Sequence, residues 1–172
     1  MLVAVTLVAA CTASGGTPAA SRSATEQPAV EQSAALSAYS CSLTIGNEPG
    51  PPAGPTVLGV VSIGTGTILG PTVRVDRGRW RYWQKHGLAI RAGNQAVTIS
   101  VPDAWRTRAA ITWGINVGIV STLRLPGCPG AQGTWNAYAG GFYLRSSSAC
   151  VPLVVEAGGR STEVHIGVGR RC

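Results

Sequence analysis

Charged residues are scarce in this chain of 172 residues. They make up 12% of the sequence, about half of the roughly 25% that is typical of soluble domains. Acidic residues are scarcer than basic ones, 7 against 14, and the formal net charge is +7 at pH 7. From Cys41 onward the excess is +8, from 13 basic and 5 acidic residues. A basic balance of this kind favours anionic partners such as cell-wall polymers or lipid headgroups.

The shortage of carboxylates also limits the chemistry that the chain could perform. A glycosidase needs two carboxylates that face one cleft, and no pair here has the spacing of a known acid–base scheme. No serine lies in the sequence context of a nucleophile elbow. We therefore expect no catalytic site. The five carboxylates after residue 40 are Glu48, Asp76, Asp103, Glu156 and Glu163.

Metal-ligand spacing is absent as well. The chain has no CxxC pair, and its two histidines, His86 and His165, are far apart in sequence. A zinc site usually shows such paired ligands. We expect neither a metal nor a dissociable cofactor.

Long hydrophobic runs are missing too. The stretch from Leu2 to Ala10 has nine apolar or small residues, whereas a membrane-spanning helix needs about 20. Nine residues fit the apolar region of a signal peptide. The letters "VAAC" at 8–11 then resemble the lipobox of bacterial lipoprotein precursors, and the Ala-, Gly- and Arg-rich composition is similar to that of lipoproteins from high-GC bacteria. The resemblance implies a signal peptide over 1–10 and a covalent lipid on Cys11.

The segment after Cys11 lacks aromatic and large apolar residues. Residues 12–35 consist mostly of Ala, Ser, Thr, Gly, Pro, Gln and Glu, and such a tract buries too little apolar surface to fold. We predict a disordered tether over 11–38 and one folded domain over 39–172. The expected location is the outer face of the cytoplasmic membrane, with a secreted protein as the alternative.

Four further cysteines fall within the predicted domain: Cys41, Cys128, Cys150 and Cys172. Four half-cystines allow three connectivities. We favour Cys128–Cys150, because the turn "PGCPG" could return to a strand that begins at Cys150. The pair Cys41–Cys172 would then join the two ends of the domain. Disulfides require an oxidising compartment, which agrees with export.

Sustained helical spacing is absent, and short apolar runs alternate with Gly and Pro. This pattern predicts an all-β domain, a disulfide-stabilised β-sandwich for which an immunoglobulin-like architecture is one option, with a small β-barrel as the alternative. The stretch from 149 to 168 predicts a hairpin around Gly158–Gly159, with Val151, Leu153 and Val155 on its buried face. The stretch from 88 to 101 predicts a second hairpin, with its turn at Gly93–Asn94.

The segment "RGRWRYWQKH" (77–86) interleaves basic and aromatic residues. Such side chains bind anionic polymers, because cations meet phosphates or carboxylates while rings stack on bases or sugars. A half-buried strand offers a second explanation, in which Trp80 and Tyr82 face the core. The candidate binding residues are Arg77, Arg79, Arg81, Trp83, Lys85 and His86.

The segment "WNAYAGGFY" (135–143) gives a second candidate. Gly140 and Gly141 leave the backbone permissive, so this stretch could form an exposed aromatic loop. Trp135 and Tyr138 would then contact a ligand or glycan.

These patterns together predict a non-enzymatic, lipid-anchored envelope protein. Its basic, aromatic-bearing domain would bind an anionic polymer, a glycan or a protein partner, and nucleic acid is not the expected ligand. One alternative is an envelope enzyme in which His86, His165, Asp76 and Asp103 converge in one pocket. The other is an accessory subunit of a membrane protein complex, which would show an apolar patch larger than a few hundred Å².

Overall fold

The computed structural model describes residues 39–51, 54–64, 68–93 and 95–172. The predicted signal peptide and the whole of the predicted tether, including Cys11, lie outside these ranges. The described residues belong to one compact unit. No helix within the described ranges is long and apolar enough to cross a membrane.

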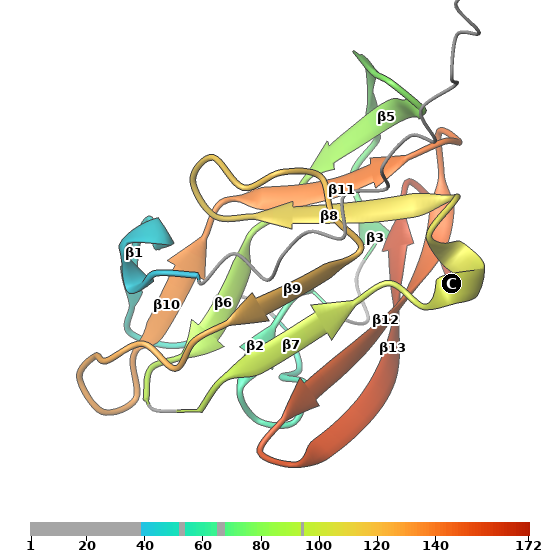
Figure 1. The fold of residues 1–172 in the computed structure, drawn as a ribbon. Helices are drawn as coiled ribbons and strands as arrows, with labels where there is room; N and C mark the ends of the chain where they lie inside the picture. The colour runs from blue at the N-terminus through green and yellow to red at the C-terminus, as the bar shows by residue number, and fades with distance from the viewer. Residues whose placement is uncertain (1–38, 52–53, 65–67, 94) are drawn as a thin grey trace, which may run out of the picture. The chain divides into compact units, whose positions relative to one another are not determined.

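Almost all of the regular secondary structure in the described residues is β-strand (Figure 1). Two short 3₁₀ helices are present, η1 (Cys41–Leu43) and η2 (Asp103–Trp105). The strands are β1 (Gly46–Glu48), β2 (Val61–Ser62), β3 (Ile68–Leu69), β4 (Val73–Arg77), β5 (Trp80–Lys85), β6 (Leu88–Arg91), β7 (Val97–Ser100), β8 (Ala109–Trp113), β9 (Thr122–Leu125), β10 (Trp135–Tyr138), β11 (Gly140–Leu144), β12 (Ala149–Ala157) and β13 (Arg160–Val168).

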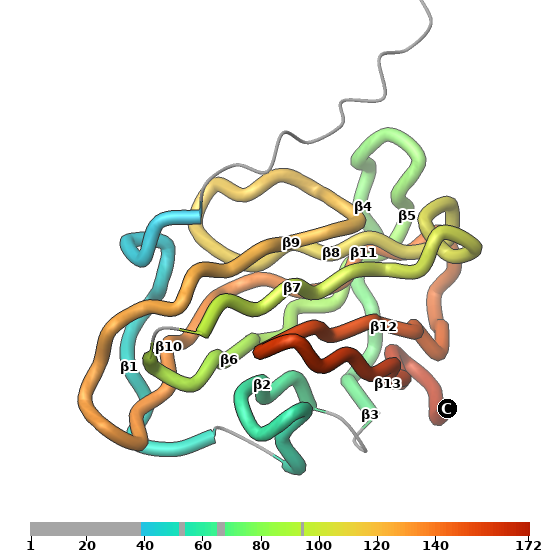
Figure 2. Tube along the Cα trace, turned by 60° about the horizontal axis from the view of Figure 1, so that its bottom comes forward, coloured from blue at the N-terminus to red at the C-terminus, as the bar shows by residue number. Residues whose placement is uncertain are grey.

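The strands form three sheets. The β6 sheet has the order β1-β10-β6-β2, and the β5 sheet has the order β4-β5-β11-β8. The β12 sheet has the order β3-β13-β12-β7-β9, and its last four strands follow one another across Figure 2. All pairings are antiparallel except that of β13 with β3.

The β6 and β5 sheets are two halves of one bent layer. Strands β5 and β6 are separated only by residues 86–87, and β10 and β11 only by residue 139. The segment that forms β10 and β11 pairs with the segment that forms β5 and β6 on both sides of this bend. Tyr138 lies opposite Leu88 on one side, and Gly141 lies opposite Lys85 on the other. Glycine is required at position 140, because a Cβ there would overlap the Thr112 carbonyl oxygen.

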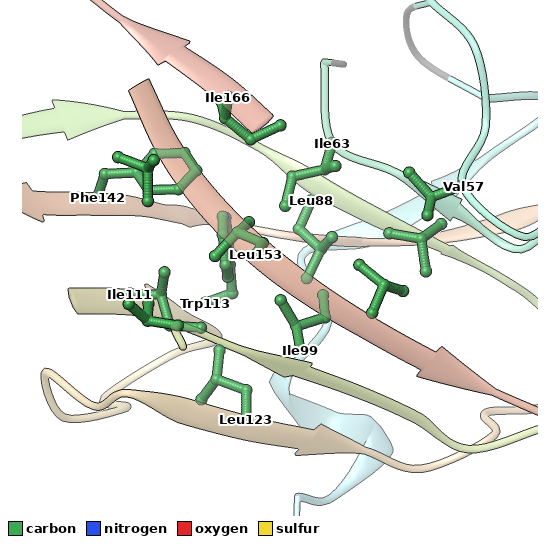
Figure 3. Close-up of a cluster of buried hydrophobic side chains, with 14 of the residues drawn as sticks. Val57, Ile63, Leu88, Ile99, Ile111, Trp113, Leu123, Phe142, Leu153 and Ile166 are labelled. Carbon is green, nitrogen blue, oxygen red and sulfur yellow. The ribbon is translucent and has the colours of Figure 1, made fainter. Parts of the chain in front are cut away.

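The core lies between this bent layer and the β12 sheet. Figure 3 shows side chains such as Leu88 and Phe142 meeting Leu153 and Ile99 from the other layer, and all four are at most 1% exposed. Trp113 packs edge-on against Phe142, with 5.3 Å between ring centroids. The predicted all-β sandwich is therefore confirmed, and the described strands do not close into the alternative barrel.

The hairpin predicted around Gly158–Gly159 is also confirmed. Val151 pairs with Ile166, Leu153 with Val164, and Val155 with Thr162. Both turn glycines have positive φ, 55° and 71°, a conformation in which glycine carries no steric penalty.

The hairpin predicted over 88–101 is wrong. Its apolar residues are buried as expected, but β6 pairs with β10 and β2 whereas β7 pairs with β12 and β9. The connection crosses from one layer to the other because its backbone bonds elsewhere: Ala92 N–H donates to Thr134 and Gly93 N–H to Cys128. Local sequence cannot distinguish this crossover from a hairpin turn.

The predicted disulfide pairing is wrong as well. The bonds are Cys41–Cys128 and Cys150–Cys172. Cys128 lies in the loop before β10, and β10 pairs with β1, which follows Cys41 closely. Cys150 lies opposite Gly167 in the β12–β13 hairpin, and the chain beyond β13 turns back to bring Cys172 to it.

The exposed aromatic loop predicted over 135–143 is wrong too. This stretch forms β10 and β11, and Trp135 and Tyr138 are 4% and 1% exposed. Both rings are part of the folded interior because β10 is a central strand between β1 and β6. They are not available as ligand contacts.

Candidate functional site

Strict alternation on three neighbouring strands separates a buried face from an outward face. Tyr82 of β5 lies opposite Leu144 of β11, which lies opposite Ala109 of β8. Leu144 and Ala109 are fully buried, so this row points into the core. Because side chains in a strand alternate between the two faces, the residues on either side of each must point outward.

The first outward row contains two rings. Trp83 lies opposite Tyr143, and Tyr143 lies opposite Ala110. The two rings are half-buried, with centroids 6.4 Å apart and planes tilted by 45°. The Trp83 indole N–H makes no hydrogen bond within the described part of the chain, so packing alone holds this ring.

The next outward row contains three arginines. Continuing the register by one residue beyond Tyr82 and Leu144 places Arg81 beside Arg145. The Arg145 backbone N–H donates to the Arg108 carbonyl oxygen at 3.1 Å, so Arg108 lies beside Arg145 on the neighbouring strand. All three are exposed, and neighbouring strands are about 4.8 Å apart. The register therefore places these three arginines side by side at one end of the β5 sheet.

We call this outward surface the basic face. It combines the arginine row, the ring pair and one lysine at the opposite end of β5. Its members are Arg81, Trp83, Lys85, Arg108, Tyr143 and Arg145.

The β4–β5 turn extends the basic character beyond the sheet. Arg77 and Arg79 are both exposed on either side of Gly78, which has a φ of 61°. The Arg79 guanidinium lies 4.8 Å from the Trp80 ring centroid. One acid stands nearby: Asp76 accepts a hydrogen bond from Arg81 Nη1 at 2.9 Å, in an exposed ion pair.

His86 does not belong to this face. It lies at the bend after β5, where its Nε2–H donates to the Ile63 carbonyl oxygen at 3.0 Å and its ring stacks on Phe142 at 6.4 Å. Burial lowers the pKa of His86 below 6.5, and the bond to Ile63 opposes that shift only partly. Together with Glu48 it lines a cavity of about 320 Å³ beside the bend. Its contacts are those of a structural residue.

The four polar residues of the enzyme alternative do not converge. Asp76 pairs with Arg81, Asp103 pairs with Arg106 at 2.8 Å, and His165 Nε2 lies 3.4 Å from Glu163. These contacts belong to the β4–β5 hairpin, the η2 helix and β13, whereas His86 lies at the bend. Among the described residues, no group of His, Cys, Asp and Glu could hold a metal ion.

The structure thus brings together Arg81, Trp83 and Lys85 from the predicted set. It places Arg77 and Arg79 at the adjoining turn. It excludes His86 and the buried Trp135 and Tyr138 from the candidate site. The sequence prediction missed Tyr143, Arg145 and Arg108. Alternation beside Leu144 could have indicated the first two, but no local signal marks Arg108.

Comparison with known proteins assigns no family to this geometry. No family model matches the chain, and no curated protein is similar to it at a significant level. The chemistry of the basic face therefore carries the functional argument.

Proposed function

We propose that residues 39–172 are a non-enzymatic binding module whose basic face binds an anionic polymer of the cell envelope. One observation carries the proposal: the row of Arg81, Arg145 and Arg108 beside the Trp83–Tyr143 pair, built from three strands. Like charges side by side on a sheet repel one another and are destabilising. An anionic ligand would reduce this repulsion among the three arginines.

The arrangement suits a polymer rather than one small anion. Lys85 and the arginine row lie at opposite ends of β5, separated along the strand by Trp83. With about 3.3 Å per residue in a strand, the cations at Arg81 and Lys85 are about 13 Å apart. A chain with repeated negative charges would contact both, and its sugar rings would pack on the aromatic pair between them.

Polymer binding is tested with fluorescein-labelled polygalacturonate, a carboxylated glycan, and with polyphosphate. The protein is the full-length chain carrying Cys11→Ser. We expect Arg81→Gln/Arg108→Gln/Arg145→Gln to lower the affinity at least tenfold and to reduce the slope of log K against log salt by about two to three. The control Arg91→Gln/Arg124→Gln/Arg160→Gln removes the same charge from exposed positions elsewhere. Equal losses in both triple variants would overturn the proposal.

We further propose that the module is exported and anchored through a lipid on Cys11. Two observations support this: the "VAAC" sequence at 8–11, and the pairing of the four later cysteines as two disulfides, which form in oxidising compartments. Cys11 is then the one cysteine outside these two pairs.

Metabolic labelling with an alkyne palmitate analogue tests the anchor. The wild-type chain should incorporate label and sediment with membranes, whereas Cys11→Ser should do neither. Ser14→Cys in the Cys11→Ser background is the control, because it supplies a thiol outside the lipobox. Labelling of that control at the wild-type level would contradict the proposal.

A further inference from the structure

A second feature lies at the arginine end of the basic face. An open cavity of about 590 Å³ is lined there by Trp105, Arg108, Arg145, Ser148, Cys150 and Arg170, among others. We call it the arginine pocket. Arg108 and Arg145 belong to both the pocket and the basic face, while Arg170 and Trp105 belong to the pocket alone.

Two of the three arginines are positioned by the sheet. Arg145 directly follows β11 and Arg108 directly precedes β8, and the bond from Arg145 N–H to the Arg108 carbonyl oxygen joins them. The Arg108 guanidinium lies 5.4 Å from the centroid of the Trp105 ring. A cation–π contact of this kind restrains a flexible side chain, so Arg108 is partly ordered before any ligand arrives.

The third arginine is brought in by the C-terminal segment. Gly169 has a φ of 65°, and a Cβ at Gly167 would overlap the Arg170 carbonyl oxygen. Glycines at these two positions therefore let the chain turn back tightly after β13. The Cys150–Cys172 disulfide then fastens the returning segment beside the start of β12. Arg170 of this segment and Trp105 of η2 accordingly line the same cavity.

Among the described residues, no carboxylate side chain lines the pocket. Asp103, two residues before Trp105, is paired with Arg106. None of Arg108, Arg145 and Arg170 forms an ion pair within the part of the chain that the structure describes. Three positive charges from separate segments therefore converge without a side-chain counterion.

We propose that the arginine pocket binds a phosphate group, and that this group is the feature by which the module selects its polymer; this rests on the proposed function above. A carboxylate offers two oxygens in one plane, which a single guanidinium fork satisfies. A phosphate group presents up to three free oxygens in a tetrahedral arrangement, and a monoester carries a charge of about −1.5 to −2 at pH 7. Three arginines and Ser148 line the pocket, so it offers more positive charge and more hydrogen-bond donors than one planar carboxylate needs.

Pyrophosphate is the probe for the pocket, with malonate as a dicarboxylate comparison. Isothermal titration with the full-length chain carrying Cys11→Ser should show pyrophosphate binding at least tenfold tighter than malonate binding. Arg170→Gln should weaken pyrophosphate binding at least tenfold. Arg171→Gln, the adjacent arginine that does not line the pocket, should change it less than twofold. Equal affinity for the two anions, or equal losses in the two variants, would overturn the proposal.

Experiments with two polymers distinguish binding at the arginine pocket from binding at the basic face. Arg170→Gln should weaken polyphosphate binding and leave polygalacturonate binding unchanged. If both polymers bind and Arg170→Gln affects neither, the pocket is wrong and the proposed function stands. If neither polymer binds but pyrophosphate binding depends on Arg170, the proposed function is wrong and the pocket stands.

The phosphate could belong to a soluble polymer or to a lipid headgroup. Co-sedimentation with phosphatidylglycerol vesicles distinguishes these sources from polyphosphate binding in solution. Loss of vesicle binding in Arg170→Gln assigns the lipid headgroup, and loss of polyphosphate binding alone assigns the polymer. If Arg170→Gln changes neither of these and also leaves pyrophosphate binding unchanged, the phosphate site is excluded.

Discussion

The outward faces of the two layers follow the same alternation but carry different chemistry. The face of β5, β11 and β8 displays the arginine row and the Trp83–Tyr143 pair. The β12 sheet displays Glu156 and Glu163, and its strands β7, β12 and β13 contain no aromatic residue. Alternation requires only that an outward residue tolerate water. Single cations occur on both faces, since Arg124 of β9 lies in the outward row of Thr98 and Glu156. The β5 face differs in its row of three arginines beside two rings, a concentration that the fold does not demand and on which the proposed function rests.

The largest expected effect concerns the bend that supports the basic face. Gly140→Ala would push a methyl group into the Thr112 carbonyl, where the paired β8 backbone cannot yield. We expect a loss of about 4 kcal/mol or more in the free energy of unfolding, measured by urea titration of tryptophan fluorescence.

Gly87→Ala is the matched control for this substitution. It lies at the same bend, and a Cβ there would meet nothing within 4 Å. Its unfolding free energy should stay within about 0.5 kcal/mol of wild type. A similar small change for Gly140→Ala would contradict the close approach of β11 to β8.

Removal of either disulfide should lower stability, but removal of only one of them should weaken ligand binding. In the chain-entropy relation, Cys41→Ala/Cys128→Ala should lose about 4 to 5 kcal/mol and Cys150→Ala/Cys172→Ala about 3 kcal/mol, because the sequence separations are 87 and 22. Only the second pair holds the segment that carries Arg170. Pyrophosphate titration of each folded variant at low temperature should therefore show weakened binding for the second alone. Weakening by the first instead would place the ligand at the other end of the domain.

The aromatic pair gives the next effect in size. Trp83→Ala should lower polygalacturonate affinity about tenfold, because it removes the large apolar surface on which the sugar rings would pack. The salt dependence should be unchanged, because no charge is lost. Val154→Ala removes a half-buried side chain from the outward face of β12 and should have no effect on binding. Equal weakening by both would erase the distinction between the faces.

A smaller, pH-dependent effect is expected at the bend. Burial holds the folded-state pKa of His86 below 6.5, so the unfolded state takes up the proton first as pH falls. His86 therefore adds stability above pH 6.5 that is lost as pH drops through its lower folded-state pKa. The fall in melting temperature between pH 7.5 and pH 5 should be smaller in His86→Gln than in wild type.

The alternation of apolar and polar residues predicted which side chains of a single strand or hairpin face the core and which face outward. The β12–β13 hairpin was specified by two glycines and by apolar residues at every second position, and the outward direction of Arg81 and Trp83 followed from the same period. That hairpin also contained an unused clue. Pairing around Gly158–Gly159 sets Cys150 opposite Gly167, only five residues before Cys172, which favours the observed disulfide over the predicted one.

The local sequence did not predict which strands pair with one another in the sheets. Nothing in "LAIRAGNQAVTISV" shows that Gly93 N–H bonds to Cys128 instead of closing a hairpin, and nothing around Arg108 shows that it aligns with Arg145. Both facts depend on register between segments far apart in the chain. The basic face is a product of that register, so only part of it was visible in "RGRWRYWQKH".

The smallest predicted effect tests whether local geometry or total charge controls binding. Asp76 competes with the ligand for Arg81, and Asp76→Asn should raise polyphosphate affinity about two- to threefold while changing stability by less than about 1 kcal/mol, as expected for an exposed ion pair. Glu163→Gln makes the same change in net charge on the β12 sheet. At 0.1 M salt the Debye length is about 10 Å, so a distant charge is screened and this variant should bind like wild type. Equal gains in both would show that the ligand responds to the whole protein's charge, and the two faces would then be equivalent for binding.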